Sequence, residues 1–339
     1  AIASGSSGNC ICVGSDNTHL LIDAGVSGKR IENGLNEIEL KTSEMQGILV
    51  THEHTDHVSG IGVLSRKYHI PIYGTVETFC AMKKGKTSIG KVDDMLFQQI
   101  FPEKALTIGE ICVTPFSVSH DAANPVAYVF EAEGHKIGMA TDLGVYTEKT
   151  MEFLKNSELL YLESNHDVNM LEVGGYPYYL KQRILGTHGH LSNDMAAELL
   201  CRLYHERLQH VLLAHLSKEN NYPELAYETV KAEISCGGHT FHASGKSATQ
   251  NGWKDFEDAF RCSFKTIEEK ESTEESTDGE KSTFRRPFLQ NERKFLQNNR
   301  QKHLRYLRKY GIINGYLKKK QKDLKYNVEF DKHFSRKYL

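Results

Sequence analysis

The sequence has no pair of cysteines at the C-x-x-C spacing and no apolar run long enough to cross a membrane. Its 7 cysteines are odd in number and widely spaced, which argues against a disulfide framework and favours a reducing compartment. No stretch reaches the ~18 consecutive apolar residues of a membrane helix, and no basic-then-apolar signal segment opens the sequence. We therefore expect a soluble protein of the cytoplasm.

Net charge is nearly absent as well, at −2 for 339 residues, but the two ends of the chain differ strongly. Residues 1–253 contain 20 Lys and Arg against 30 Asp and Glu, a balance of −10. Residues 284–339 contain 17 against 4, a balance of +13. A basic extension of this kind favours contact with nucleic acid or another anionic surface. The alternative for it is a merely solvated extension.

Composition changes near Trp253 and divides the chain into three parts. We expect a catalytic domain over residues 1–253. Residues 254–283 are predicted to form an acidic flexible linker, because the Glu-, Ser- and Thr-rich stretch 267–283 has almost no apolar residues to bury. Residues 284–339 are predicted to form a basic, partly helical extension.

Short apolar segments alternate with longer helical ones over the first 245 residues, which predicts an α/β layered fold. The strands are expected at 19–23, 47–51, 70–74, 111–119, 125–132, 136–141, 159–162 and 210–214. The helices are expected at 58–68, 76–83, 147–156, 178–184, 194–207 and 223–234.

The strongest local signal is the segment HEHTDH at residues 52–57. It places four ligand-type side chains, His52, His54, Asp56 and His57, directly after an expected strand. A strand end is a rigid place from which to aim side chains, and imidazole with carboxylate suits zinc, iron or manganese. The alternative, a chance His-rich turn, is disfavoured because four such residues rarely fall within six solvated positions.

Three more ligand-type residues stand directly after apolar strands: His120, Asp142 and His215. Binding sites in α/β folds form where strands end. Each residue alone would be interpreted as an ordinary core or loop residue. Their agreement with the HEHTDH segment predicts one metal centre built from all seven side chains.

The order of these residues resembles the metallo-β-lactamase superfamily, in which HxHxDH is followed by His, Asp and His. Asp23, in the segment LIDAG, matches that superfamily's early structural Asp. The resemblance implies an αββα sandwich of two mixed β-sheets. It also implies two divalent metal ions at one edge of the sandwich, either Zn²⁺ or Mn²⁺, with iron as a third option. It assigns His52, His54 and His120 to one metal, Asp56, His57 and His215 to the other, and Asp142 to a bridging position.

A narrower resemblance is to the bacterial YycJ/WalJ subfamily, over roughly residues 1–240. It is carried by ASGSSGNC at 3–10, ESNHD at 163–167 and GHLSN at 189–193. That subfamily is associated with 5′→3′ DNA exonuclease activity. The resemblance therefore implies a phosphodiesterase that cleaves DNA with a hydroxide held between two metals.

The same motifs supply candidates for proton transfer. His190 and His166 are candidate proton donors to the leaving oxygen, because imidazole titrates near the working pH. Glu163 is a candidate to orient either ring, and Asp56 to accept a hydrogen bond from the nucleophile. The alternative for Glu163 and His166 is that they stabilise a loop.

Candidate substrate contacts are Ser192 and Asn193, which stand where a helix is expected to start, and Asn165. Free N–H groups at a helix start attract phosphate. The alternative for Ser192 and Asn193 is ordinary capping. For the glycine-rich segment 4–9 the sequence leaves two interpretations, an anion-binding loop and a tight turn.

Two other functions stay open beside DNA cleavage. A small-molecule hydrolase, either a glyoxalase II-type thioesterase or a cyclic phosphodiesterase, needs no basic groove and suits an acidic domain. A non-catalytic binding protein that works through its basic extension is disfavoured by the intact set of candidate ligands.

Overall fold

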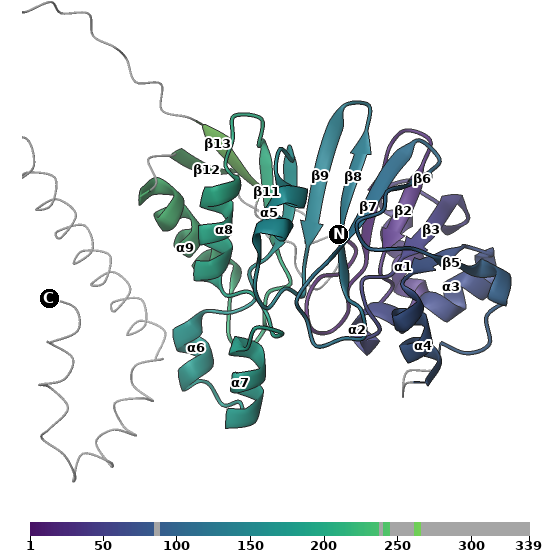
Figure 1. The fold of residues 1–339 in the computed structure, drawn as a ribbon, viewed down its shortest axis with the longest axis horizontal. Helices are drawn as coiled ribbons and strands as arrows, with labels where there is room; N and C mark the ends of the chain where they lie inside the picture. Colours follow the sequence, from purple (N-terminus) through teal and green to yellow (C-terminus); the bar gives the residue numbers. More distant parts are fainter. Residues whose placement is uncertain (85–88, 237–239, 245–260, 266–339) are drawn as a thin grey trace, which may run out of the picture. The chain divides into compact units, whose positions relative to one another are not determined.

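The computed structural model describes residues 1–84, 89–236, 240–244 and 261–265. Within these residues two β-sheets pack face to face, and helices cover their outer faces (Figure 1). Both sheets contain parallel and antiparallel pairs. The predicted αββα sandwich is therefore confirmed.

The smaller sheet has its strands in chain order: β1 (Ile11–Gly14), β2 (His19–Ile22), β3 (Met45–Leu49), β4 (Ile72–Gly74) and β5 (Phe97–Gln99). The larger sheet runs in the order β12 (Thr240–Ser244), β13 (Arg261–Lys265), β11 (His210–Ala214), β10 (Leu159–Glu163), β9 (His135–Ala140), β8 (Val126–Ala132), β7 (Ile111–Ser117) and β6 (Leu106–Ile108).

Alternation along single strands explains the layers. In β2, Leu20 and Ile22 join the apolar cluster between the sheets, whereas Leu21 joins the cluster beneath the outer helices. Successive side chains of a strand point to opposite faces, so one short strand serves two cores. The smaller sheet is covered by α1 (Gly28–Asn36), α3 (Ile61–Tyr68) and α4 (Val76–Lys84), and the larger sheet by α5 (Glu148–Leu154), α8 (Asn193–Leu203) and α9 (Pro223–Cys236).

Three short helices lie near one edge of the sandwich (Figure 1): α2 (Thr55–Val58), α6 (Val168–Val173) and α7 (Tyr178–Leu185). The same edge collects the carboxyl ends of parallel strands, because β2, β3 and β4 run parallel in one sheet and β9, β10 and β11 in the other. Loops that leave these strands therefore meet at one place.

The structure corrects two of the expected helices. The helix predicted over 58–68 is divided into α2 and α3 at Gly60, whose N–H donates to Ala24 O at 2.7 Å. A Cβ there would lie 2.3 Å from Val26 O, so only glycine allows this close approach. The helix predicted over 194–207 ends at Leu203.

The domain boundaries stay predictions. Residues Arg261–Lys265, inside the stretch expected as a linker, form β13 and pair with β11. The basic extension 284–339 lies outside the described residues. In the part of the chain that is described, no helix is long and apolar enough to cross a membrane.

Gly25 provides a test of how tightly the loops at this edge pack. A Cβ at Gly25 would lie 1.6 Å from Asp56 O, whereas one at Gly175 would meet nothing within 4 Å. We expect Gly25→Ala to destabilise the fold by about 1–3 kcal/mol, as overpacking does, and to lower the melting temperature by several degrees. Gly175→Ala is the control, and thermal unfolding is the measurement. Equal melting temperatures for the two variants would contradict the packing described.

Candidate metal centre

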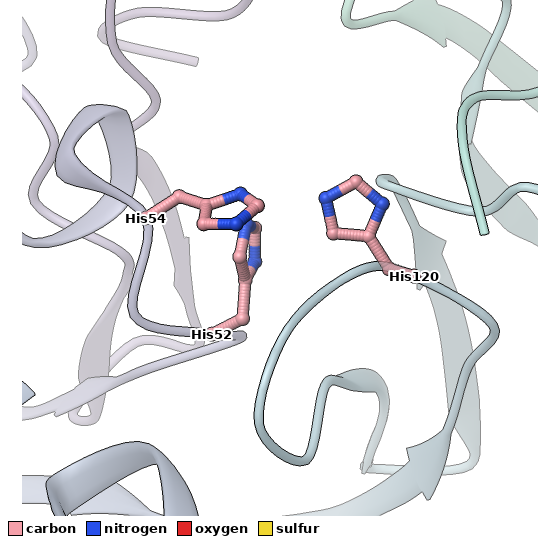
Figure 2. Close-up of side chains that lie close together, drawn as sticks. All are labelled: His52, His54 and His120. Carbon is pink, nitrogen blue, oxygen red and sulfur yellow. The ribbon is translucent and has the colours of Figure 1, made fainter. Parts of the chain in front are cut away.

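The HEHTDH segment leaves β3 and turns directly into α2. His54 is the N-cap residue of that helix, so Asp56 and His57 stand in its first turn. His52 and His54 come from the loop before it, and His120 faces them from the loop that follows β7 (Figure 2). The ring centroid of His52 lies 4.5 Å from that of His54 and 4.9 Å from that of His120. One ligand atom from each ring lies within 4.8 Å of the others.

Asp142 and His215 follow β9 and β11 in the larger sheet. Both have left-handed backbone angles, φ 57° and 56°, as does Asp23 with φ 57° after β2. Such angles are unfavourable for residues with a side chain and persist where the surrounding structure enforces them, often at functional sites. Here they turn the side chains back across the edge of the sheets.

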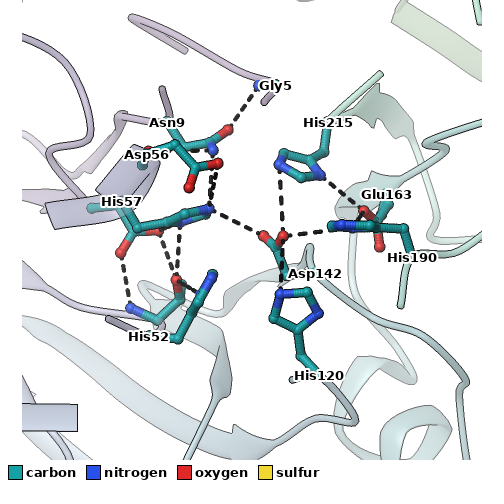
Figure 3. A network of polar contacts seen from close by, with 12 residues as sticks. Gly5, Asn9, His52, Asp56, His57, His120, Asp142, Glu163, His190 and His215 are labelled. Carbon is teal, nitrogen blue, oxygen red and sulfur yellow. Dashed lines mark hydrogen bonds and ion pairs between the residues drawn. The ribbon is translucent and has the colours of Figure 1, made fainter. Parts of the chain in front are cut away.

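Asp142 occupies the centre of the cluster (Figure 3). Its carboxylate oxygens lie 3.5 Å from His57 Nε2, 3.7 Å from His120 Nε2 and 3.6 Å from His215 Nε2. Asp56 Oδ2 lies 3.6 Å from His57 Nε2, and the Asp56 side chain is 29 % exposed. The structure thus brings together all seven residues that the sequence selected.

Several atoms that face this centre are buried without a hydrogen-bond partner. They are the Nε2 atoms of His52, His120 and His215 and the Oδ2 atom of Asp142. An unsatisfied buried polar atom costs about 1–3 kcal/mol. Four of them in one cluster fit bound cations, because imidazole nitrogen and carboxylate oxygen are the donors that divalent metals take.

The opposite ring nitrogens are held by a second set of groups. His57 Nδ1 lies 2.7 Å from Asp23 Oδ2, His215 Nδ1 lies 2.9 Å from Glu163 Oε1, and His120 Nδ1 lies 3.0 Å from a backbone oxygen. Donating Nδ1–H to these acceptors fixes the tautomer that leaves the Nε2 lone pair free for a metal. The acceptor for His120 is Gly189 O.

The N-terminal segment 4–9, whose role the sequence left undecided, also contacts the candidate ligands. Ser4 Oγ accepts from Tyr161 OH at 2.8 Å and from the His215 N–H at 3.0 Å. Asn9 Oδ1 accepts from the Gly5 N–H at 2.8 Å, and Asn9 Nδ2 lies 3.0 Å from His57 Nε2. Sequence reasoning did not identify Ser4 or Asn9 as individual residues, because their partners among the candidate ligands lie 211 and 48 positions further along the chain, respectively.

Electrostatics in this cluster favour positive charge. Burial and the neighbouring His57 lower the pKa of His52 well below its usual range, so its ring is neutral. Burial alone would raise the pKa of Glu163, but the neighbouring His190 and His215 outweigh it and lower this pKa to about 2. Burial alone would lower the pKa of His57, but the carboxylates of Asp142 and Asp23 outweigh it and raise this pKa to about 10. Protons therefore balance the buried carboxylates at neutral pH, and a cation that replaces them binds more tightly as pH rises.

Glu163 selects one of the two histidines that the sequence offered it. Its Oε1 atom lies 2.8 Å from His190 Nδ1, and its Oε2 atom accepts the Leu143 N–H at 2.8 Å. His190 is 18 % exposed at its side chain. His166, in contrast, is buried, its ring nitrogens have no hydrogen-bond partner, and burial lowers its pKa to about 4. The pairing of Glu163 with His166 is thus replaced by pairings with His190 and His215.

The candidate substrate contacts have structural partners. Ser192 Oγ caps α8 by accepting from the Met195 N–H at 3.2 Å. Asn193 is buried and its Oδ1 accepts from Ser164 Oγ at 2.6 Å. Asn165 Nδ2 donates to His215 O at 2.8 Å. These contacts explain all three residues without a substrate, and their role in binding one stays a prediction.

Comparison with known proteins agrees with this geometry. Residues 18–215 match the family model described as the Beta-lactamase superfamily domain. The chain belongs to this superfamily. An exodeoxyribonuclease YycJ of Bacillus anthracis is 42% identical over 229 residues, 68% of this chain and 86% of that protein. An exodeoxyribonuclease WalJ of Streptococcus pneumoniae is 41% identical over 234 residues, 69% of this chain and 87% of that protein. Both the superfamily and the narrower resemblance are confirmed.

Solved structures show the same fold. The metallo-β-lactamase fold protein YhfI of Bacillus subtilis superposes with a TM-score of 0.51 at 18% identity, over 69% of this chain and 91% of that one. The prediction of an enzyme is confirmed at the level of this hydrolase superfamily.

Glu163→Gln tests whether the carboxylate behind the rings supports metal binding. The side chain keeps its size but loses one acceptor oxygen, so one N–H group that now donates to it is left unpaired. We expect metal affinity to fall ~10- to 100-fold, as changes to such supporting groups do, with the fold retained. Competition titration with a chelating dye measures it. The exposed Glu131→Gln is the control, and matching affinities in the two variants would refute the supporting role.

Proposed function

We propose that the chain is a dinuclear metal-dependent phosphodiesterase, and that its substrate is DNA cleaved from the 5′ end. The observation that carries the metal centre is the set of buried Nε2 atoms without partners around the Asp142 carboxylate. We assign His52, His54 and His120 to one metal, Asp56, His57 and His215 to the second, and Asp142 to both. Zn²⁺, Mn²⁺ and iron suit this donor set.

When bound, two such cations supply an activated water at neutral pH and neutralise charge on the phosphate oxygens. The chain's own residues do the remaining work. Asp56 has a partly exposed carboxylate, and we assign it to orient the attacking water by accepting a hydrogen bond. His190, held by Glu163 and partly exposed, is assigned to give a proton to the leaving oxygen.

DNA as the substrate is supported by the relatives named exodeoxyribonucleases. The basic extension, with 17 Lys and Arg against 4 Asp and Glu in residues 284–339, would add affinity for the phosphate backbone that depends on salt but not on sequence. A cytoplasmic enzyme with access to DNA is consistent with this proposal.

A small-molecule hydrolase of the same fold is the second candidate. The charge of −10 over residues 1–253 favours it, because an acidic body repels a polyanion. A glyoxalase II-type thioesterase and a cyclic phosphodiesterase both fall in this class, and neither needs a basic surface.

A panel of substrates distinguishes these activities. The full chain, supplied with Mn²⁺ or Zn²⁺, is given 5′- and 3′-labelled DNA, bis-p-nitrophenyl phosphate, a cyclic nucleotide and an acyl-glutathione thioester. We expect stepwise shortening of DNA from its 5′ end and slower cleavage of the small diester. Thioester or cyclic nucleotide turnover without DNA cleavage would replace the proposal with the second candidate.

His190→Ala tests the assignment of the proton donor. We expect turnover on DNA to fall ~10²- to 10⁴-fold, the usual contribution of such a group, while metal content is unchanged. The exposed neighbour His188→Ala is the matched control and should retain full turnover. Loss of a metal from the His190→Ala protein would show instead that His190 is a ligand.

A further inference from the structure

Two adjacent tyrosines on α7 are among the most exposed large side chains of the described residues. Tyr178 is 76 % exposed and Tyr179 is 74 % exposed. They belong to residues 168–185, here called the α6–α7 arm, which also exposes Val173 and Leu185. A ring left in water without burial is costly. The exposed apolar side chains of the arm are therefore typical of a surface that binds another molecule.

The arm is joined directly to the metal centre. The chain leaves α7 at Leu185 and within five residues reaches Gly189, which holds His120, and then His190. Arg183 on α7 donates from Nε to Asp121 Oδ2 at 2.5 Å, and Asp121 follows His120. Figure 1 shows the arm at the edge of the sandwich that carries α2. A molecule that contacts the arm is thus next to the candidate ligands.

The charge of the arm differs from that of the domain around it. No acidic residue occurs between Glu172 and Asp194, and this stretch contains Lys181 and Arg183. With Glu172 included, the arm has a net charge of +1 in a domain, residues 1–253, that has 20 basic and 30 acidic residues, which leaves −11 for the rest. The side chain of Lys181 is fixed by two carbonyls, Glu172 O at 2.8 Å and Gly174 O at 2.7 Å. The arm is consequently less acidic than the rest of the domain, which suits contact with a polyanion.

We propose that Tyr178 and Tyr179 stack on the bases of an unpaired DNA strand whose end lies at the metal centre. This inference rests on the proposed function and names the form of its substrate. Stacking of a base on an aromatic ring is worth about 1–3 kcal/mol and works for every base. It supplies affinity without clustered Lys and Arg, which an acidic domain lacks. It also suits an exonuclease, which must accept any sequence.

The test uses the full chain and the double variant Tyr178→Ala/Tyr179→Ala. We expect the KM for single-stranded DNA to rise at least about tenfold, the loss of one or two stacked bases. The kcat for bis-p-nitrophenyl phosphate, which has no bases, should not change. The double variant Tyr178→Phe/Tyr179→Phe keeps both rings and should restore the KM. Phe101→Ala removes another half-exposed ring from outside the arm and serves as the matched control.

Each result decides the inference. A raised KM in the alanine variant alone, with rescue by phenylalanine, supports it. An unchanged KM for single-stranded DNA overturns it and leaves the tyrosines to a protein partner. Equal defects in the alanine and phenylalanine variants also overturn it, because stacking needs only the ring. Failure of the proposed function gives a different result. In that case the unaltered chain cleaves no DNA but turns over the thioester of the substrate panel.

Discussion

The structure depends on the meeting of one buried carboxylate with several buried imidazoles. Asp142 lies within 3.7 Å of the Nε2 atoms of His57, His120 and His215. A carboxylate removed from water is stable only beside positive charge or hydrogen-bond donors. The protein places Asp142 where the loops of two sheets converge, so the fold and the charge of the site impose conditions on each other.

Two further carboxylates make this arrangement rigid. Asp23 accepts from His57 Nδ1 and from the Thr51 hydroxyl and N–H. Glu163 accepts from His190 and His215 and from backbone N–H groups. Each sheet therefore contributes one acceptor that fixes the rings of its own side. The result is a set of Nε2 lone pairs whose direction is determined before any cation arrives, which is what preorganisation requires.

The sequence alone indicated the residues at strand ends and missed those whose partners are distant. The seven candidate ligands were recognisable because His, Asp and short apolar strands recur together, and the strand ends of the two mixed sheets then bring them to one edge. Asn9 and Ser4 were not recognisable, because a glycine-rich loop has no sequence pattern that indicates its hydrogen-bond partners. β5 and β6 have three residues each, too few for alternation to be visible. The choice of Glu163 between His166 and His190 needed coordinates, since both histidines stand in equivalent motifs.

Metal content per chain tests the central claim most directly. Elemental analysis of the purified full chain, after dialysis against Zn²⁺ or Mn²⁺ and removal of excess metal, should give about two ions per chain. Asp142→Ala should lose both ions at matched concentration, because its carboxylate is assigned to the two positions together. One ion per chain in the unaltered protein, or two ions retained by Asp142→Ala, would contradict a centre built around this carboxylate.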